Sequence, residues 1–449
     1  MEKLIKAAQK HAQRALAAMD FMWKNPETGY REWKANEYLL REFRELGYEP
    51  VLAGNIPGFY VDVDTGRPGP TVAVMGEMDS LICASHPEAD PATGYVHACG
   101  HCCQAAGLLG LAAALTEPGM LDDWCGKIRL MEVPAEELIE VEFRESLRKN
   151  GTIKYFGGKV EFMYRGFLDG VDMAFMIHSS SGLGAHAGSI IKGSNGCMPK
   201  TVTFHGKSSH AGGSPHNGIN ALYAANQALG AVNALRETFQ DADCVRFHPI
   251  ITNGGTVVNA IPETVTIETY VRGATMDCIL ENNEKINRAI AGSAAAIGAG
   301  VTISDRPGYS PRVQDMGMML VAKEAMEAVL DKVEWDPTRW GKGSTDMGDV
   351  SMVMPVVHPS LGGVAGILHG NNFCIDDPDT ACVDMTKIEL AMLDVLLREN
   401  AKRALEIKEN FVPTFPSMEA FFAAIDRLDM DKDAVIYNEN GSVTLNYKK

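Results

Sequence analysis

The chain has 449 residues, of which 46% are hydrophobic and 22% charged, the composition of an ordinary globular protein rather than a disordered or fibrous one. At this length we expect two to three domains and a sizeable buried core. The 41 Lys and Arg residues are outnumbered by 58 Asp and Glu, and the resulting formal net charge of −17 argues against nucleic acids and anionic membranes as partners.

The N-terminal residues 1–20 interleave basic and apolar residues at helical spacing, which predicts an amphipathic surface helix rather than a signal peptide. The longest strongly apolar run, Ala105–Leu115, is far shorter than the roughly 20 residues that cross a bilayer. Ten cysteines without a secretion signal are typical of a reducing compartment. We therefore expect a cytoplasmic protein with no membrane segment.

Two parts of the chain alternate short apolar strands with helices. We expect strands at residues 71–79, 127–134, 173–178 and 363–369, and helices at 104–115, 316–330 and 386–407. This alternation predicts a layered α/β domain.

A different order separates these two parts. Residues 201–206, 219–239, 245–252, 264–271, 276–297 and 301–304 read as strand, helix, strand, strand, helix and strand. This βαββαβ order is ferredoxin-like. We expect a small domain, 196–306, inserted into a larger one formed by 1–195 and 307–449, with a C-terminal extension that ends in a hairpin near residues 438–441.

Candidate metal ligands follow the predicted strands of the larger domain. Asp79 ends the first strand, Glu136 and Glu137 follow the second, and His178 and His369 close the third and fourth. Sites in α/β sheets form beyond the carboxyl ends of strands, and zinc or manganese needs several such side chains together. Adjacent carboxylates can divide the work, one binding the metal and the other moving a proton.

The segment HACGHCC adds Cys99, His101, Cys102 and Cys103 before an apolar helix. Two other interpretations of this segment remain open. The first is a structural zinc site in a non-enzymatic protein, although no second paired motif supplies four closed ligands. The second is a cysteine hydrolase with Cys99 or Cys103 as the nucleophile, which would leave the paired glutamates without a role.

A series of motifs in order along most of the chain resembles the M20 metallopeptidase family, in its amidohydrolase branch of aminoacylase-like and aminobenzoyl-glutamate-hydrolase-like enzymes. The motifs are NPETGYRE, GEMDSL, HACGH, PAEE, GFLDGVDMAFMIH, GKSSHAGGSPHNGINAL, GGTVVNAIPE, GSTDMGDVS and GILHGNNF. The resemblance implies a metallopeptidase-type catalytic domain, 1–195 and 307–449, with a mixed sheet flanked by helices, and an inserted lid and dimerisation domain, 196–306.

The resemblance also implies a role for each matching residue. Glu136 would be the general base, and Asp79 would orient the ligands. Glu77, at a position where other branches carry a metal-binding His, is either a spare ligand or a loop carboxylate, and we favour the loop carboxylate. One or two zinc or manganese ions would be held by five residues, with the cysteine able to bridge two ions: Cys99, His101, Glu137, His178 and His369.

In the inserted domain, the segment SSHAGGSPHNG resembles one that supplies a histidine, here His210, to the active site of a partner subunit, which implies a homodimer. His216 is a weaker candidate for this role. Asn259 and Arg272 resemble positions that bind the carboxylate or backbone groups of the substrate.

One departure separates this chain from that branch. His101 is followed by Cys102, Cys103 and Gln104, and the first of these positions usually holds a carboxylate or an amide. Three consequences remain open. The residues that support the metal ligands could differ, Cys102 could be a further ligand, or the protein could have lost catalysis. The implied function is metal-dependent hydrolysis of the amide bond of small N-acyl amino acids or dipeptides. The motif GSTDMGDVS favours an aromatic or bulky acyl group.

Overall fold

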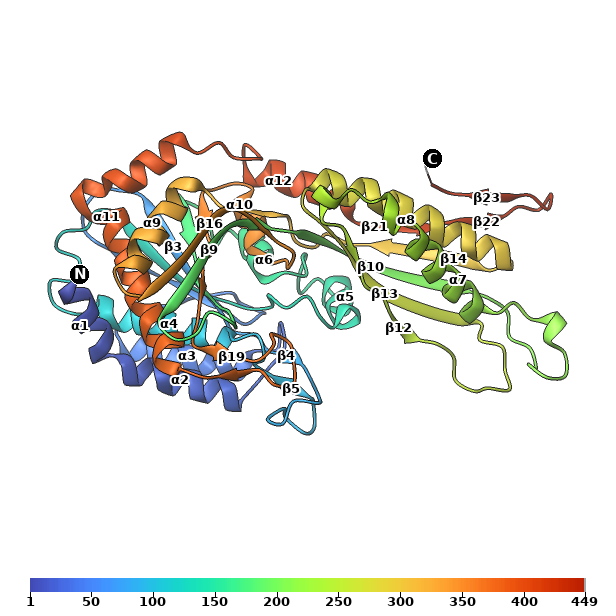
Figure 1. The fold of residues 1–449 in the computed structure, drawn as a ribbon, viewed down its shortest axis with the longest axis horizontal. Helices are drawn as coiled ribbons and strands as arrows, with labels where there is room; N and C mark the ends of the chain where they lie inside the picture. The colour runs from blue at the N-terminus through green and yellow to red at the C-terminus, as the bar shows by residue number, and fades with distance from the viewer. Residues whose placement is uncertain (448–449) are drawn as a thin grey trace. The chain divides into compact units, whose positions relative to one another are not determined.

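The computed structural model describes residues 1–447, and the chain divides into two compact units (Figure 1). The first unit consists of Met1–Gly193, Arg312–Trp340 and Thr345–Met418. The second consists of Ser194–Pro311, Gly341–Ser344 and the segment that starts at Glu419.

The first unit is built on a six-stranded mixed sheet. Its strands, in spatial order, are β1 (Val51–Leu52), β2 (Phe59–Asp64), β6 (Lys127–Val133), β3 (Thr71–Glu77), β7 (Met173–Phe175) and β17 (Val356–Val357). The strands β6, β3, β7 and β17 are parallel, so their carboxyl ends lie at one edge. Nearly every residue of β3 is buried, as a central parallel strand covered on both faces requires.

Helices pack against this sheet and against one another. The central one is α4 (His101–Leu115), whose 15 residues are all buried against neighbours that include α2 and β3. None of the described helices combines the length and the apolar character needed to cross a membrane. The other helices of this unit are α1 (Glu2–Lys10), α2 (Ala12–Lys24), α3 (Trp33–Glu45), α5 (Val141–Lys149), α6 (Gly158–Tyr164), α9 (Met316–Glu327), α10 (Met347–Ser351) and α11 (Met385–Asn410).

The first unit also holds a smaller sheet that the sequence did not predict. Its path is β15 (Arg312–Val313), β9 (Ala187–Ser194), β18 (Ser360–Leu361) and β8 (His178–Ser179), and β16 (Lys332–Gly341) also pairs with β9. Two further strand pairs join β4 (Leu81–Ile82) to β5 (Tyr95–Val96) and β19 (Val364–Ala365) to β20 (Cys374–Ile375).

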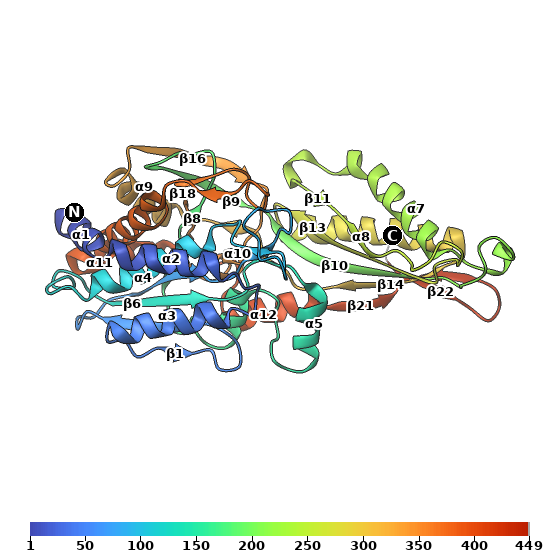
Figure 2. The same ribbon diagram turned by 90° about the horizontal axis from the view of Figure 1, so that it is seen from below.

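The second unit has the predicted ferredoxin-like order. Its antiparallel sheet runs β11 (Arg246–Phe247), β13 (Thr264–Gly273), β10 (Gly196–His205), β14 (Gly300–Asp305) and β21 (Met430–Asp433), with β12 (Ile250–Asn253) also paired to β13. The helices α7 (Ala221–Ala234) and α8 (Met276–Ile297) pack on this sheet and on each other (Figure 2). Alternate residues of β13 are buried, which matches a sheet covered on one face.

Several boundaries differ from the expected ones. The strand expected at 245–252 is divided into β11 and β12, and the strand expected at 363–369 is only the short β19. The N-terminal helix is interrupted at His11.

The C-terminal tail packs in the second unit, not with the larger domain as expected. After α12 (Met418–Ile425), β21 adds to the edge of β14, and β22 (Val435–Tyr437) and β23 (Val443–Leu445) form the predicted hairpin. The buried Ala434 and Val435 join the apolar core of this unit, which accounts for the placement of the tail.

Candidate metal centre

The carboxyl ends of β3 and β6 bring together the acidic residues of the centre. Glu77 is the last residue of β3, and Asp79 follows two positions later. Glu136 and Glu137 lie in the loop after β6, which runs parallel to β3 in register. All four side chains are buried, so any negative charge on them must be balanced inside the protein.

Asp79 contacts both His101 and the loop that carries Glu137. Its Oδ1 lies 3.0 Å from His101 Nδ1, and its Oδ2 accepts a hydrogen bond of 2.7 Å from the backbone N–H of Glu137. The contact at Nδ1 turns the opposite nitrogen, Nε2, of the His101 ring toward the carboxylates. These contacts are compatible with the orienting role that the resemblance implies for Asp79.

The loop that carries Glu136 and Glu137 is fixed from both sides. The backbone N–H of Ala135, a non-glycine residue with a positive φ of 59°, donates to Glu32 Oε1 at 2.7 Å. Arg144 donates to the backbone carbonyls of Ala135 at 3.3 Å and of Glu137. Glu32 lies in the NPETGYRE motif, whereas no sequence signal identified Arg144.

The expected ligands converge on two sets of three that share one thiol. Cys99, His101 and His178 form one set, and Cys99, Glu137 and His369 form the other, with the ligand atoms of each set within 4.8 Å of one another. Cys99 Sγ lies 3.4 Å from His178 Nε2, and His369 Nε2 lies 3.0 Å from Glu137 Oε1. A thiolate shared by two ligand sets fits a centre of two ions bridged by Cys99.

Three buried polar atoms of the centre indicate whether these residues suit a metal. His101 Nε2, Glu77 Oε2 and Glu137 Oε1 are buried and form no hydrogen bond of normal geometry among the described residues. Each faces another atom of the centre, since His101 Nε2 lies 3.2 Å from Glu77 Oε2 and Glu137 Oε1 lies 3.0 Å from His369 Nε2. Nitrogen, sulfur and carboxylate donors that face one another in a buried cluster suit zinc or a similar divalent ion.

The charges of the ligands depend on one another. Burial and the neighbouring Glu137 favour the neutral thiol of Cys99, but His101 and His178 outweigh them and lower its pKa to about 6. Burial and the carboxylates Glu77 and Glu137 raise the pKa of Glu136 well above its usual range. Glu136 therefore accepts a proton more readily than an ordinary carboxylate, as a group that transfers protons must.

Glu77 is not the loop carboxylate that we expected. It is fully buried at the end of β3, and its Oε1 accepts a hydrogen bond from Lys159 Nζ. Lys159, in the first turn of α6, also donates from Nζ to Asp346 Oδ1 at 2.5 Å and from its backbone N–H to Asp346 Oδ2 at 2.8 Å. Asp346 lies in the GSTDMGDVS motif, but Lys159 was missed because a single lysine usually signals an exposed surface.

A second buried cation lies in the same unit. Arg312 donates from Nη1 to the backbone carbonyl of His358 at 3.1 Å. The His358 ring is buried, with its centroid 5.7 Å from that of His178. Burial, followed by Arg312 and His178, lowers the pKa of His358 well below its usual range.

The unusual cysteines after His101 lie outside the ligand sets. Cys102 and Cys103 are fully buried in the first turn of α4 and belong to the apolar core of the first unit. Neither thiol joins a potential metal-binding group among the residues that the structure describes. This placement gives no support to Cys102 as a ligand or to a structural zinc site built from these cysteines.

The remaining candidates lie in the second unit. His210 is exposed, and its Nδ1 accepts hydrogen bonds from the N–H groups of Gly212 and Gly213, at 3.1 and 2.9 Å. Asn259 lies on the neighbouring segment, since its carbonyl accepts from the backbone N–H of Ala211 at 2.9 Å.

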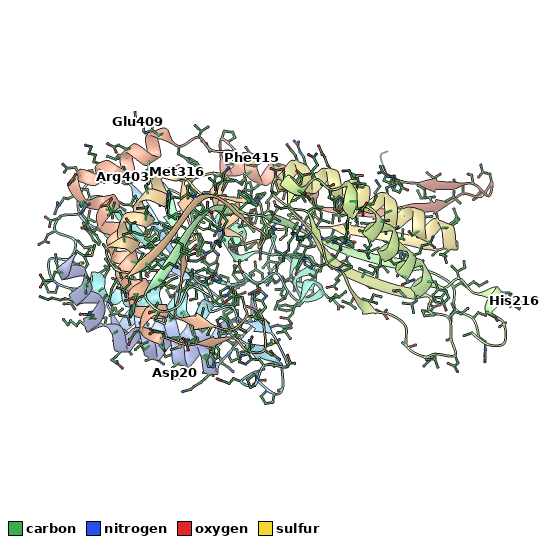
Figure 3. The ribbon with its side chains drawn as sticks, in the orientation of Figure 1. Asp20, His216, Met316, Arg403, Glu409 and Phe415 are labelled. Atoms are coloured by element: carbon green, nitrogen blue, oxygen red, sulfur yellow. The ribbon has the colours of Figure 1, made fainter. Side chains whose placement is uncertain are left out.

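Arg272 donates from Nη1 to Ser344 Oγ at 2.9 Å and from Nε to His248 Nε2 at 3.1 Å. His216, the weaker candidate, is exposed at the tip of the loop that follows β10 (Figure 3).

Similar proteins support the resemblance. The chain is 34% identical over 277 residues to the indole-3-acetyl-aspartic acid hydrolase of Enterobacter agglomerans, covering 58% of each protein. It is 28% identical over 383 residues to the Xaa-Arg dipeptidase of Mus musculus, covering 78% of this chain and 76% of that one. It is 31% identical over 285 residues to one of the subunits of the p-aminobenzoyl-glutamate hydrolase of Escherichia coli, covering 59% of this chain and 60% of that one.

The chain thus spans about 60% of the length of the first and third of these relatives. A solved structure of a dinuclear metal-binding peptidase from Bacillus subtilis shares the fold, with a TM-score of 0.64, 20% identity, and coverage of 86% of this chain and 99% of that one. The profile of peptidase family M20/M25/M40 matches residues 73–394, well over half of the sequence. The chain belongs to peptidase family M20/M25/M40.

Proposed function

We propose that this protein is a metal-dependent amidohydrolase that cleaves the amide bond of a small N-acyl amino acid or a dipeptide. The observation that carries the proposal is the pair of ligand sets that share Cys99, with Glu136 beside them. Zinc or manganese bound there would supply an acidified water and polarise the scissile carbonyl. Cys99, His101 and His178 would hold one ion, and Cys99, Glu137 and His369 the other.

The residues of the chain divide the remaining work. Glu136 takes a proton from the attacking water and returns it to the leaving nitrogen, and its raised pKa makes it a better proton acceptor than an ordinary carboxylate. Asp79 keeps the His101 ring oriented through Nδ1. Arg272, fixed by Ser344 and His248, is suited to the carboxylate of the substrate, and Asn259 to its backbone polar groups.

The names of the relatives support this substrate class. Indole-3-acetyl-aspartic acid and p-aminobenzoyl-glutamate each join an aromatic acyl group to an acidic amino acid, and an Xaa-Arg dipeptide joins two amino acids. Each compound contains an amide whose leaving group is an amino acid. We therefore favour aroyl and other bulky acyl amino acids as the first substrates to test.

The test is a hydrolysis screen with matched variants. Purified protein loaded with zinc or manganese should release free amino acid from some of these compounds, and a chelator should abolish the release. Glu136→Gln should keep its metal but lose 10²- to 10⁴-fold in rate, whereas Glu117→Gln, which alters a surface carboxylate paired with Lys10, should match the unmodified protein. Near-normal turnover by Glu136→Gln would remove that residue from the mechanism.

The alternative function of a cysteine hydrolase is also compatible with the structure. The Cys99 thiol, whose pKa is lowered to about 6, lies 3.4 Å from His178 Nε2, the arrangement of a cysteine nucleophile and its base. The same screen separates the two functions, because a cysteine hydrolase should remain active after chelation. Tight metal binding without any hydrolysis would instead favour a binding protein or a scaffold that has lost catalysis.

We further propose that the active enzyme is a homodimer in which His210 acts in the partner subunit. Because Nδ1 accepts from two backbone N–H groups, the proton of the neutral ring lies on Nε2, which can then donate to an oxyanion. Mixing inactive His210→Ala and Glu136→Gln subunits should restore turnover, since one site of each mixed dimer holds both residues. No recovery despite subunit exchange, or a monomer at working concentration, would contradict the shared site.

A further inference from the structure

We propose that Glu77 is an additional ligand for the ion bound by His101, and that Lys159 and Asp346 hold it in place. The inference rests on the proposed metal-dependent function. It goes beyond that function because it adds a sixth protein ligand and assigns two positioning residues.

The first observation is the geometry between Glu77 and His101. Glu77 Oε2 lies 3.2 Å from His101 Nε2, within ion-pair distance, but neither atom makes a hydrogen bond of normal geometry among the described residues. Two buried ligand atoms that face each other in this way can share a divalent ion when the nitrogen carries no proton. Glu136 Oε2 lies 3.9 Å from the same nitrogen, and the ligand atoms of Glu77, His101 and Glu136 lie within 4.8 Å of one another.

The second observation is that Lys159 takes only one oxygen of Glu77. Oε1 accepts from the Lys159 ammonium, which leaves Oε2 to bind a cation. A carboxylate that is held at one oxygen loses little rotational freedom when its other oxygen coordinates a metal. Lys159 therefore acts as a clamp on the ligand.

The clamp is itself rigid. The side chains of Lys159, Glu77 and Asp346 are completely buried. Asp346 binds both the ammonium and the backbone N–H of Lys159, so it fixes the start of α6 as well as the side chain. A Cβ on Gly158 would lie 1.6 Å from the carbonyl oxygen of Pro134, which shows how tightly α6 abuts the loop of Glu136.

Lys159 cannot be a ligand or a proton-transfer group itself. Although burial disfavours its charge, Asp346, Glu77 and Glu136 together hold the pKa of Lys159 above its usual range. An ammonium has three donors and no lone pair. The role that remains for Lys159 is to fix and partly neutralise the carboxylates next to the ions.

The experiment measures metal affinity directly. Protein stripped with a chelator is titrated with Zn²⁺ in a calorimeter, with two ions per chain expected. Glu77→Gln retains an oxygen that can accept from Lys159 but removes the negative charge, so it should weaken one binding event by at least about 10-fold and leave the other unchanged. Wild-type affinity for both ions in a folded Glu77→Gln protein would overturn the proposal.

Lys159→Met tests the clamp, and the chain offers a matched control. Lys200 is also a buried lysine, which donates to Asn287 Oδ1 at 2.6 Å and to Asp305, but it lies in the core of the second unit. Lys159→Met should weaken the same ion as Glu77→Gln, Lys159→Arg should restore part of the affinity, and Lys200→Met should leave both ions unaffected. An equal loss of metal affinity in Lys200→Met would show that the loss in Lys159→Met comes from general destabilisation. That result would overturn the positioning role of Lys159.

A second readout does not depend on how stable Lys159→Met is. When Co²⁺ replaces zinc, its visible absorption becomes more intense as the coordination number falls. Glu77→Gln should therefore give a more intense spectrum than the unmodified protein, and an identical spectrum would overturn the ligand assignment. If the unmodified protein binds two ions and hydrolyses its substrate while Glu77→Gln binds both equally, only this inference fails. Absence of metal binding and hydrolysis in the unmodified protein would instead refute the proposed function.

Discussion

Replacing Asp79 by asparagine should weaken metal binding by changing which nitrogen of His101 carries the proton. If His101 binds an ion through Nε2, as proposed, its Nδ1 must carry the proton and donate it to Asp79. The asparagine has only one acceptor oxygen, whereas Asp79 also accepts from the backbone N–H of Glu137 at 2.7 Å. If that oxygen stays with Glu137, the amide nitrogen faces Nδ1 and favours the proton on Nε2.

Loss of such an orienting partner typically costs 10- to 100-fold in metal affinity, which corresponds to about 1.4–2.7 kcal/mol. Calorimetric titration of the metal-free Asp79→Asn protein with Zn²⁺ measures this loss. Asp394→Asn is the matched control, because Asp394 accepts from Trp124 Nε1 at 2.9 Å and belongs to no ligand set. Unchanged affinity in Asp79→Asn, or an equal loss in Asp394→Asn, would refute the reasoning.

Metal binding should release protons, because the pKa values of His101 and His178 are raised by Cys99 and neighbouring carboxylates despite the opposing effect of burial. The affinity for the metal should therefore increase as the pH rises through these raised pKa values. Calorimetric titrations in two buffers of different ionisation enthalpy should show that more than one proton is released. No proton release would contradict the charge assignment. Gly158→Ala should lower the free energy of unfolding by about 1–3 kcal/mol or more, since its Cβ would collide with Pro134, and a denaturant titration showing no loss would contradict the tight packing. Cys102→Asp should destabilise the fold, because it buries a carboxylate in the apolar core, and an unchanged melting temperature would show that the site is more open than its burial indicates.

The sequence located much of the centre because parallel strands share one carboxyl edge. Asp79, Glu136 and Glu137 were predicted at strand ends, and they lie together after β3 and β6 as that reasoning requires. His369 is different, since it lies in a loop after the short β19 and not at the end of a central strand. Its backbone N–H donates to Ala98 at 2.8 Å, which brings this loop to Cys99. The strand-end reasoning therefore singled out His369 for a structural reason that does not hold, whereas the family motif identifies it independently.

The residues that sequence reasoning missed are buried charges with partners far away in the chain. Lys159 is 82 positions from Glu77 and 187 from Asp346, and nothing local distinguishes it from a surface lysine. The signals that could have found it are indirect. Glu77 is an acidic residue at the end of an entirely buried strand, where an unbalanced charge is costly, and Asp346 lies in a motif whose partner the sequence does not reveal.

The departure after His101 is explained by the position of α4 rather than by a change in the ligands. Because His101 is the first residue of α4, the next two side chains turn away from the centre into the apolar core. Sequence comparison alone treats Cys102 as a neighbour of the metal, whereas the helix turns its side chain about 100° from that of His101 and into the apolar core.

The balance of charge explains why the centre needs cations. Five buried carboxyl groups surround it: Glu77, Asp79, Glu136, Glu137 and Asp346. The ammonium of Lys159 pairs with two of them, Glu77 and Asp346. In the metal-free protein, protons on His101, His178 and His369 supply part of the missing positive charge, which is why all three imidazoles have raised pKa values. Protons and metal ions therefore compete for the same nitrogen atoms. A centre that holds protons this strongly without metal retains enough negative charge to bind divalent ions when those protons leave.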